Sequence, residues 1–446
     1  MAKLPPARAA ALDCLHSCLL EGRDLQAALD TALTSSPLTD RDSALVTELV
    51  YGYCRLKGRI DAILDGLLDP GRPLHEESRL ALGLAAHEIV HLDKVPGYAS
   101  VNWAVDWAKG YTRASLSGLF NAVLRRVCDL AAEARTVAPY KKGAQDEAQV
   151  LSRYYSCPEW IVRLWLAEYP REEAARLLKA QARPPAVGLA VEREAFPARG
   201  GDEQAEALAR RLGAHPACLG RSGLGLAFAP GTSLSALAEE LSLTPQEQDA
   251  LYRQGYAARE ALAALSPQRW KTPVWDACCG RGGKTRLILE SGCAPVVASD
   301  SHIGRLRALM RELAPAVDSG RLLVLRARAD QPAPLAAPAP TILLDAPCTG
   351  LGTLSRRPDI KWKRTEADLE NLARTQAAML DQAWRALAPG GTLYYLTCTL
   401  TPQENQRQVG AFTARTPDAR LQATWTTPPA VASGEFFFSA SLTRGA

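Results

Sequence analysis

The chain has no run of about 18 apolar residues, the length that a helix needs to cross a membrane. Its first residues, MAKLPPARAA, also lack the apolar core of a secretory signal peptide. We therefore expect a cytoplasmic protein without a membrane anchor. The net charge is only +4, from 52 basic and 48 acidic side chains, so the composition permits nucleic-acid binding but does not require it.

Metal and disulfide patterns are absent as well. No CxxC pair occurs among the 11 cysteines, their number is odd, and neither they nor the six histidines follow the spacing of a zinc site. A disulfide framework is unexpected in a long chain without an export signal. We expect no metal, and most thiols should be small buried hydrophobic groups.

Residues 1–140 carry the pattern of amphipathic helices. Apolar side chains recur at positions i, i+3, i+4 and i+7 in the segment 40–68, and the same period returns in 78–92, 98–111 and 116–131. No strand-like alternation interrupts them. The pattern predicts an all-α domain, followed by a polar linker at 136–148.

The rest of the chain predicts two further domains. Residues 150–245 mix a helical segment with two short strands, which indicates a small α+β middle domain. From 246 to 446, short apolar strands alternate with helices, as in a doubly wound, Rossmann-like α/β sheet with ligands at the carboxyl ends of its strands. The predicted strands lie at 272–277, 294–300, 321–327, 341–346 and 392–398, with another at 435–442.

The segment CCGRGGKT at 278–285 joins the first of these strands to a helix. A phosphate-binding loop would need glycine at position 278, where Cys278 stands, so a nucleotide hydrolase is disfavoured. Acidic residues end or follow three strands, at Asp276, Asp300 and Asp330. Such carboxylates can accept ribose hydroxyls or pair with a cationic sulfonium, which favours a nucleoside cofactor. The alternatives are a plain glycine turn and solvated acidic caps.

Two cysteines stand at strand ends. Cys348 follows the strand 341–346 in the sequence Asp345-Ala-Pro-Cys, and Cys398 ends the strand 392–398. In a doubly wound sheet both thiols would emerge at the ligand-binding edge, although a single cysteine is more often a buried structural residue. A thiolate that adds to C6 of cytosine activates C5 for methylation, and a second group must then help to release the product. Asp345 could orient the base.

Several motifs together resemble one family. DACCGRGGKT, VVASD, LLDAPCTGLGTLSRRPDIKW and YYLTCTLTPQEN resemble the Nol/Nop/Sun family of RNA 5-methylcytosine methyltransferases. The segments ALVTELVYGYCRLKGRID and LSGLFNAVLRRV resemble the NusB-like, RNA-binding domain of its bacterial RsmB (Sun) branch. The similarity covers nearly the whole chain.

The resemblance implies an S-adenosylmethionine-dependent rRNA cytosine-5 methyltransferase that acts on 16S rRNA, and we expect a monomer. It implies Cys398 as the nucleophile and Cys348 as the group that releases the methylated RNA. The cofactor-binding residues that it implies are Cys278, Cys279, Gly280, Arg281, Gly282, Gly283, Lys284, Asp300, Arg305, Asp330 and Asp345.

The sequence departs from the family pattern at three places. Arg281 stands where the family has proline in the glycine loop. Arg259 and Glu260 occupy a stretch that lacks the usual VQDxAS pattern, and the aspartate before the Gly-Phe-Phe sequence is missing from SGEFFFSASL. These departures concern cofactor binding, and they leave room for a non-catalytic RNA-binding factor as the alternative function. Both cysteine motifs are intact.

A basic segment directly after the Cys348 motif is the predicted RNA contact. Basic side chains suit phosphates and a tryptophan could stack on a base, although a solvated charged loop has the same composition. The target cytosine must leave its stack to reach a thiolate, so we expect a flipped or single-stranded base. The residues are Arg356, Arg357, Lys361, Trp362 and Lys363.

Overall fold

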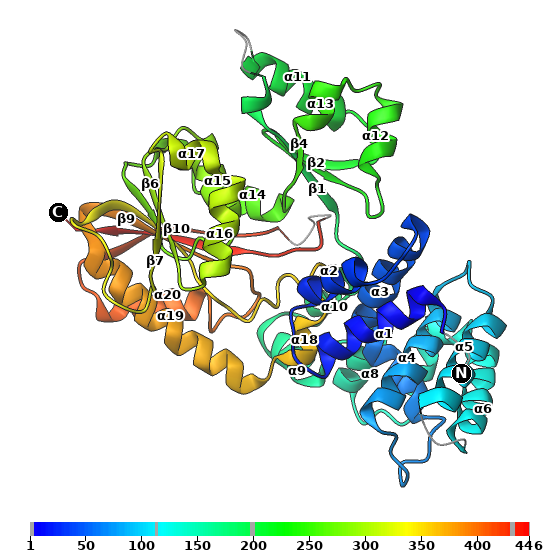
Figure 1. The fold of residues 1–446 in the computed structure, drawn as a ribbon. Coiled ribbons are helices and arrows are strands. Elements are labelled where there is room, and N and C mark those ends of the chain that lie inside the picture. Colours follow the sequence, from blue (N-terminus) through cyan, green and yellow to red (C-terminus); the bar gives the residue numbers. More distant parts are fainter. Residues whose placement is uncertain (1–3, 112–114, 197–200, 429–432, 446) are drawn as a thin grey trace. The chain divides into compact units, whose positions relative to one another are not determined.

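The computed structural model describes residues 4–111, 115–196, 201–428 and 433–445 (Figure 1). The chain divides into two compact units, which are treated separately below. The first contains Met1–Arg183 together with the short segment Arg357–Arg364, and the second contains Pro184–Arg356 and Thr365–Ala446.

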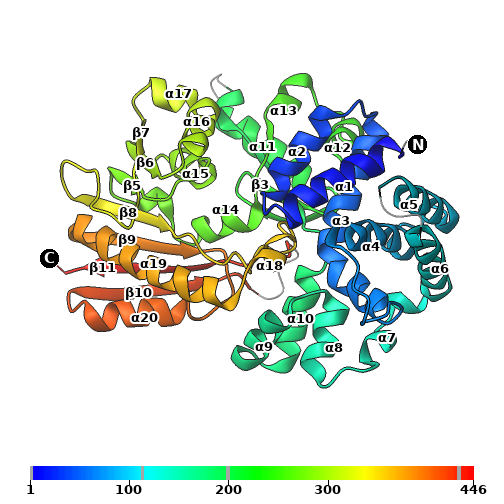
Figure 2. The same ribbon diagram turned by 60° about the horizontal axis from the view of Figure 1, so that its bottom comes forward.

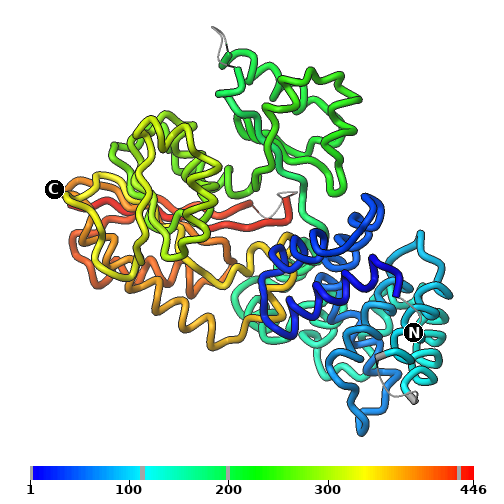
Figure 3. Tube along the Cα trace, in the orientation of Figure 1, coloured from blue at the N-terminus to red at the C-terminus, as the bar shows by residue number. Residues whose placement is uncertain are grey.

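In its described residues the first unit contains helices joined by loops and no strands, as the blue-to-teal part of the trace shows (Figure 3). Its long third helix begins with a capping box, in which Thr39 and Asp42 satisfy each other's backbone N–H groups. Leu49, Val50 and Tyr53 form the face of that helix that is buried in the core. The all-α prediction is confirmed. The helices are α1 (Pro6–Leu19), α2 (Leu25–Ser35), α3 (Asp40–Asp65), α4 (Glu76–His91), α5 (Gly97–Tyr111), α6 (Ser115–Leu130), α7 (Ala138–Lys141), α8 (Glu147–Tyr155), α9 (Glu159–Glu168) and α10 (Arg171–Gln181).

The first unit continues past the boundary that we predicted near residues 140–150. Helix α8 packs against α3, and α9 and α10 pack against α8. The reason is visible in the burial pattern, because Ile161, Val162 and Trp165 of α9 are fully buried. The predicted linker at 136–148 contains the short helix α7.

The segment Arg357–Arg364 is held by α3 through side chains that donate to backbone carbonyls. Lys361 Nζ lies 2.8 Å from the carbonyl oxygen of Arg55, and Trp362 Nε1 lies 2.6 Å from that of Cys54. Gly58 leaves room for the indole, because a Cβ there would lie 2.9 Å from a Trp362 ring carbon. The short helix α18 (Ile360–Lys363) is therefore part of the helical unit, although it follows the Cys348 motif in sequence.

A four-stranded antiparallel sheet begins the second unit. Its strand order is β2-β3-β1-β4, and the two short strands expected within 183–192 and 223–228 are present, at 187–191 and 225–228. Helices α11–α13 complete this part, which confirms the small α+β domain of the fold prediction. The elements are β1 (Val187–Val191), α11 (Gly201–Gly213), β2 (Cys218–Ser222), β3 (Gly225–Phe228), α12 (Leu234–Glu240), α13 (Pro245–Asp249) and β4 (Leu251–Arg253).

A seven-stranded sheet of order β10-β11-β9-β8-β5-β6-β7 forms the rest of the second unit. Strands β5 to β9 are parallel, and β11 and β10 are added antiparallel at one edge. The Rossmann-like prediction is confirmed. The strands are β5 (Val274–Asp276), β6 (Val296–Asp300), β7 (Leu322–Arg326), β8 (Ala339–Asp345), β9 (Leu387–Thr397), β10 (Ala419–Thr426) and β11 (Phe438–Arg444).

Helices cover both faces of this sheet (Figures 1 and 2). One core contains residues of α14, α15 and α16, and the other contains residues of α19 and α20. The strand order reverses at the neighbours β5 and β8, and a sheet of this class binds ligands at the carboxyl ends beside that point. The helices are α14 (Tyr256–Ala263), α15 (Gly283–Glu290), α16 (Ile303–Glu312), α17 (Ala314–Asp318), α19 (Glu366–Ala386) and α20 (Gln406–Arg415).

The contacts of Trp362 predict a structural role. We expect Trp362→Ala to lower the free energy of unfolding around α3 by about 3 kcal/mol, because indole packing and the bond to Cys54 are lost. Hydrogen exchange of the α3 amides measures this effect without RNA. The control, Trp425→Ala in β10, should leave α3 protection unchanged. Weaker RNA binding with normal α3 protection would instead favour the predicted base contact.

Candidate active site

The two cysteines of the sequence motifs meet at the carboxyl ends of β8 and β9. Their Sγ atoms are 3.4 Å apart, and the backbone N–H of Cys398 points to Cys348 Sγ at 3.4 Å. Parallel pairing sets Asp345 opposite Leu396, so the residues that follow each strand emerge together. The expectation that both thiols reach the same edge of the sheet is met in the geometry.

Gly352 locks the loop after Cys348 onto the loop of Cys398. Its N–H donates to the Cys398 carbonyl at 3.0 Å, and its own carbonyl accepts from Phe436 N–H at 2.8 Å. A Cβ at this position would lie 2.2 Å from the Phe436 oxygen, so only glycine permits the approach. The sulfur contact is thus supported by backbone bonds on both loops.

The electrostatics of the thiol pair are unequal. The pKa of Cys348 is raised well above its usual value by the hydrogen bond with Cys398, by burial and by the negative charges of Cys398 and Glu404. Cys348 is therefore held as the neutral thiol in the resting site. A neutral thiol beside Cys398 can act as a weak hydrogen-bond donor to a thiolate.

A lysine–aspartate pair stands next to the cysteines. Lys284 Nζ lies 2.6 Å from Asp345 Oδ2 and 5.5 Å from the centre of the Phe437 ring. Burial lowers the pKa of Lys284, but the charge and hydrogen bond of Asp345, helped by Cys398 and Asp276, outweigh it and raise the pKa overall. The ammonium is therefore retained against the Asp345 carboxylate, and it interacts electrostatically with Cys398.

The glycine loop runs from β5 into α15 with two left-handed residues, Gly280 (φ 57°) and Gly282 (φ 89°). The N–H of Gly280 donates to Asp300 Oδ2 at 3.0 Å, which ties the loop to the end of β6. A Cβ on Gly282 would lie 2.9 Å from Leu309 Cγ. Both glycines are required by the turn, and α15 begins directly after them at Gly283.

Four acidic residues converge on Cys278 of this loop. Burial raises the pKa of the Cys278 thiol well above its usual value, and the charges of Asp345, Asp276, Asp300 and Asp330 raise it further. Burial likewise raises the pKa of Cys279. The two loop cysteines are therefore protonated, unlike a nucleophile.

Asp276 is the deepest of these acids. It is fully buried, accepts a 2.7 Å hydrogen bond from Thr285 Oγ1, and its Oδ1 has no protein partner. Burial raises its pKa to about 7, against the hydrogen bond from Thr285. An unpartnered buried carboxyl oxygen at a glycine loop fits a site that receives a polar ligand.

The remaining cofactor residues of the sequence prediction lie around the same strand ends. Asp300 also accepts from His302 N–H at 2.8 Å and lies 3.7 Å from a guanidinium nitrogen of Arg305, whereas Asp330 pairs with Arg328 at 2.6 Å. A pocket beside β6 and β7 is lined by Ser301, Arg326, Ala327, Arg328 and Gln331. Strand-end acids beside a glycine turn fit a nucleoside with a cationic group.

Arg281 leaves the glycine loop intact. Its side chain is mostly exposed and pairs with Glu312 of α16 at 3.1 Å. The turn itself is set by Gly280, Gly282 and the bond to Asp300. The departure from the family pattern at this position therefore leaves the turn in place.

The five predicted RNA contacts all have partners inside the protein. Arg356 pairs with Glu435 at 2.7 Å and Arg357 with Asp24 at 2.8 Å. Lys363 pairs with Asp359 at 2.8 Å, and the carbonyl bonds of Lys361 and Trp362 are described above. Burial lowers the pKa of Lys361 to about 8. These contacts explain the side chains without RNA, and their role in RNA binding stays a prediction.

Glu404 and Asn405 end the motif that contains Cys398, and no role was assigned to them from the sequence. Both are buried, and both bond to residues that flank the cysteines. Gln376 of α19 joins them, with Nε2 2.9 Å from the Pro347 carbonyl. The only indication for Glu404 in the sequence is a charged residue shortly after the strand end that carries Cys398. Nothing in the sequence identifies Gln376.

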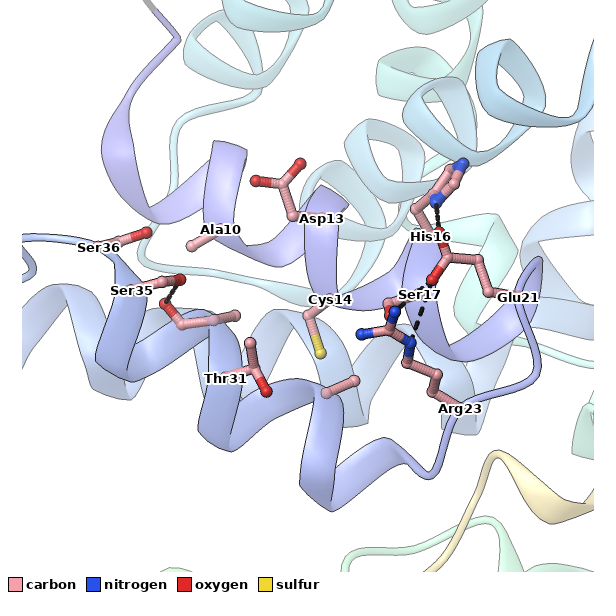
Figure 4. Close-up of a pocket in the computed structure, with 12 residues that line it drawn as sticks. Ala10, Asp13, Cys14, His16, Ser17, Glu21, Arg23, Thr31, Ser35 and Ser36 are labelled. Atoms are coloured by element: carbon pink, nitrogen blue, oxygen red, sulfur yellow. Dashed lines mark hydrogen bonds and ion pairs between the residues drawn. The ribbon is translucent and has the colours of Figure 1, made fainter.

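Another pocket lies between α1 and α2 (Figure 4). Glu21 bridges His16 and Arg23 at its rim, and Cys14 lines it. Burial raises the pKa of Cys14 to about 12, so this thiol is not an activated nucleophile.

Within the described residues no three His, Cys, Asp or Glu side chains could hold a metal ion. No described helix is both long and apolar enough to span a membrane.

Comparisons with known proteins agree with this geometry. A family model described as 16S rRNA methyltransferase RsmB/F matches residues 262–439, and a NusB family model matches residues 5–129. Ribosomal RNA small subunit methyltransferase B of Vibrio cholerae is 32% identical over 431 residues, 93% of this chain and 90% of the relative. The crystal structure of PH0851 has the same fold, with a TM-score of 0.73 at 20% identity over 99% of both chains. That of NSun6 from Pyrococcus horikoshii with SFG gives a TM-score of 0.51 at 19% identity, over 65% of this chain and 98% of that one.

The glycine loop yields a matched pair of variants. We expect Gly282→Ala to lower stability by about 1–3 kcal/mol and to abolish S-adenosylmethionine binding, because its Cβ meets Leu309 and its φ is positive. Gly283→Ala should fold normally, because nothing lies within 4 Å of its Cβ. Chemical denaturation and calorimetric titration measure the two effects. Equal stability of both variants would contradict the assigned loop geometry.

Proposed function

The chain belongs to the RsmB/F family of 16S rRNA methyltransferases, and we propose that it methylates C5 of a cytosine through a covalent bond between Cys398 and C6. It is an S-adenosylmethionine-dependent rRNA methyltransferase with a NusB domain. The finer proposal concerns the base, the atom and the thiol. By the family description, the proposed substrate is 16S rRNA.

One observation carries this proposal: two thiols in contact, beside a lysine–aspartate pair, at the ligand edge of the sheet. Methylation at C5 needs a nucleophile for C6 and a second group for product release, and the pair supplies both. Lys284 interacts electrostatically with Cys398, and a nearby ammonium favours the thiolate form that attacks. A methyl transfer to a nitrogen or an oxygen would leave the thiol pair unexplained.

In the first step, the Cys398 thiolate forms a bond to C6, and the π electron pair of the C5–C6 double bond shifts to C5, in conjugation with the C4–N3 group, so that C5 becomes nucleophilic. Asp345 is proposed to accept a hydrogen bond from the cytosine amino group while Lys284 holds its carboxylate in place. When bound, S-adenosylmethionine supplies the methyl group that C5 takes up. The glycine loop, Asp300 and Asp330 are proposed to bind and orient this cofactor, with the other family-matched positions.

In the second step, a base removes the C5 proton, the electron pair re-forms the C5–C6 double bond, and the C6–sulfur bond breaks. Cys348 is the proposed base. Its high pKa arises first from the hydrogen bond with Cys398, and that contribution is lost once Cys398 has become a neutral thioether. Cys348 thus becomes easier to deprotonate once the adduct has formed: it releases its proton to solvent, and the resulting thiolate takes the C5 proton.

The division of roles predicts opposite results for the two cysteines. Cys398→Ser should reduce methyl transfer to background, because the hydroxyl is a far weaker nucleophile. Cys348→Ser should instead accumulate a covalent protein–RNA adduct that survives denaturing gels. Cys128→Ser, at an exposed thiol of the helical unit, is the control and should behave as the wild type.

The same assay separates the alternatives. An adduct in Cys398→Ser but not in Cys348→Ser would mean that Cys348 is the nucleophile and Cys398 the releasing group. A methylated product from the wild type without an adduct in either variant would refute covalent catalysis. A wild-type protein that binds RNA without binding radiolabelled S-adenosylmethionine would be the non-catalytic factor. Bisulfite sequencing of 16S rRNA from a deletion strain identifies the cytosine.

A further inference from the structure

A buried carboxylate lies between the two cysteine loops and bonds to both of them. Glu404 is fully buried, and its Oε1 accepts hydrogen bonds from Thr349 N–H at 2.8 Å and Gln376 Nε2 at 3.0 Å. Its Oε2 accepts from Thr349 Oγ1 at 2.5 Å and from Thr401 Oγ1. Thr349 directly follows Cys348, and Thr401 belongs to the loop of Cys398. One side chain therefore binds both cysteine loops.

Neighbouring bonds extend this connection to the residues on either side of Cys398. The hydroxyls of Thr349 and Thr399 are 2.8 Å apart, which joins the two loops a second time. Asn405 Nδ2 donates to the Thr399 carbonyl at 3.0 Å, and Asn405 Oδ1 accepts from Thr397 Oγ1 at 2.5 Å. The residues before and after Cys398 are thereby fixed relative to Thr349.

A buried carboxylate fixes the orientation of the donors that surround it. Moving it out of water is unfavourable unless its lone pairs are filled, so each donor around it must stay aimed at it. Here the donors are two hydroxyls, an amide and a backbone N–H. Because these donors come from both loops, neither loop can shift without breaking bonds to a buried charge-bearing group.

We propose that Glu404 is a positioning residue that holds the Cys348 loop against the Cys398 loop and so keeps the two sulfur atoms in contact. The inference rests on the proposed function, since it gives that contact a purpose in methyl transfer. The contact itself can be measured without RNA or cofactor. The charge of Glu404 also contributes, after the hydrogen bond with Cys398 and burial, to the raised pKa of Cys348.

The test compares Glu404→Gln with Glu404→Asp in the full-length protein. Glutamine has the same size but replaces one acceptor oxygen with an NH₂ group, which faces donors instead of acceptors. Aspartate keeps both acceptor oxygens on a shorter side chain. The matched control is Gln408→Met, because Gln408 is also buried but donates to the Ala373 carbonyl, away from both cysteines.

The first readout is the equilibrium of the thiol pair in mixtures of reduced and oxidised glutathione. Forming one Cys348–Cys398 disulfide oxidises two thiols and reduces one oxidised glutathione to two glutathione molecules. Peptide mass spectrometry distinguishes this disulfide from those of the other cysteines. We expect Glu404→Gln to lower its equilibrium constant by about tenfold or more, Glu404→Asp to restore part of it, and Gln408→Met to match the wild type.

The second readout is methyl transfer to RNA. We expect Glu404→Gln to reduce kcat about 100-fold with little change in KM for S-adenosylmethionine, because misplaced reacting groups affect the chemical step. Its pH–rate profile should also shift, since one cause of the raised Cys348 pKa is removed. Partial recovery in Glu404→Asp would separate positioning from a general loss of folding.

The outcomes are distinguishable. A wild-type disulfide equilibrium in a folded Glu404→Gln variant would overturn the positioning role. If that variant does not fold, Thr349→Val and Thr401→Val each remove one donor, and an unchanged equilibrium in both would overturn the role as well. If Cys348→Ser accumulates no RNA adduct while the disulfide equilibrium still responds to Glu404→Gln, the proposed function fails and the positioning role stands.

Discussion

Everything proposed for the active site depends on the parallel pairing of β8 with β9. That register sets Asp345 opposite Leu396, and the N–H of Ala346 donates to the Leu396 carbonyl at 2.9 Å. Two thiols that are 50 positions apart in the sequence then leave neighbouring strand ends and come within 3.4 Å. A shift of one residue in either strand would turn one thiol to the opposite face. The positions of the two thiols are therefore determined first by backbone hydrogen bonds between the strands and only then by side-chain contacts.

Buried charge is the second constraint, and the site accommodates it in three ways. Lys284 and Asp345 neutralise each other, which keeps an ammonium next to a thiol in a largely buried place. Glu404 has only hydrogen-bond donors around it, and Asp276 keeps one oxygen without a protein partner. The first arrangement keeps a charged pair in the site, the second ties the two cysteine loops together through hydrogen bonds, and the third leaves one carboxyl oxygen for a polar ligand.

The sequence predicted most of this site because its chemistry is local. The strand-end position of Cys348 and Cys398 could be read from short apolar segments followed by polar turns, and the glycine loop from its own composition. Asp276, Asp300 and Asp330 were also recognisable as strand-end acids. What could not be read was the partner of each side chain, because Glu404 and Gln376 act through contacts with residues 28 to 55 positions away.

The basic segment after the Cys348 motif shows the same limit more strongly. Lys361 and Trp362 have the composition of an RNA contact, yet their donors meet carbonyls of α3 more than 300 positions earlier. The composition shows that the segment contains a charged lysine, but it does not show that a backbone carbonyl of α3 lies within hydrogen-bond distance of that lysine. The boundary predicted near 140–150 lies inside the first compact unit for a related reason, because the packing of α8 against α3 cannot be predicted from the helical pattern alone.

Arg281 illustrates the opposite case, in which an apparent departure has little structural consequence. A proline restricts φ near −65°, and its absence would matter if that residue set the turn. In this loop the turn is set by Gly280 and Gly282, which have positive φ, and by the bond from Gly280 to Asp300. Arg281 instead points outward to Glu312. The turn of the glycine loop therefore does not depend on the residue at position 281, because its shape is determined by the glycines on either side of that residue.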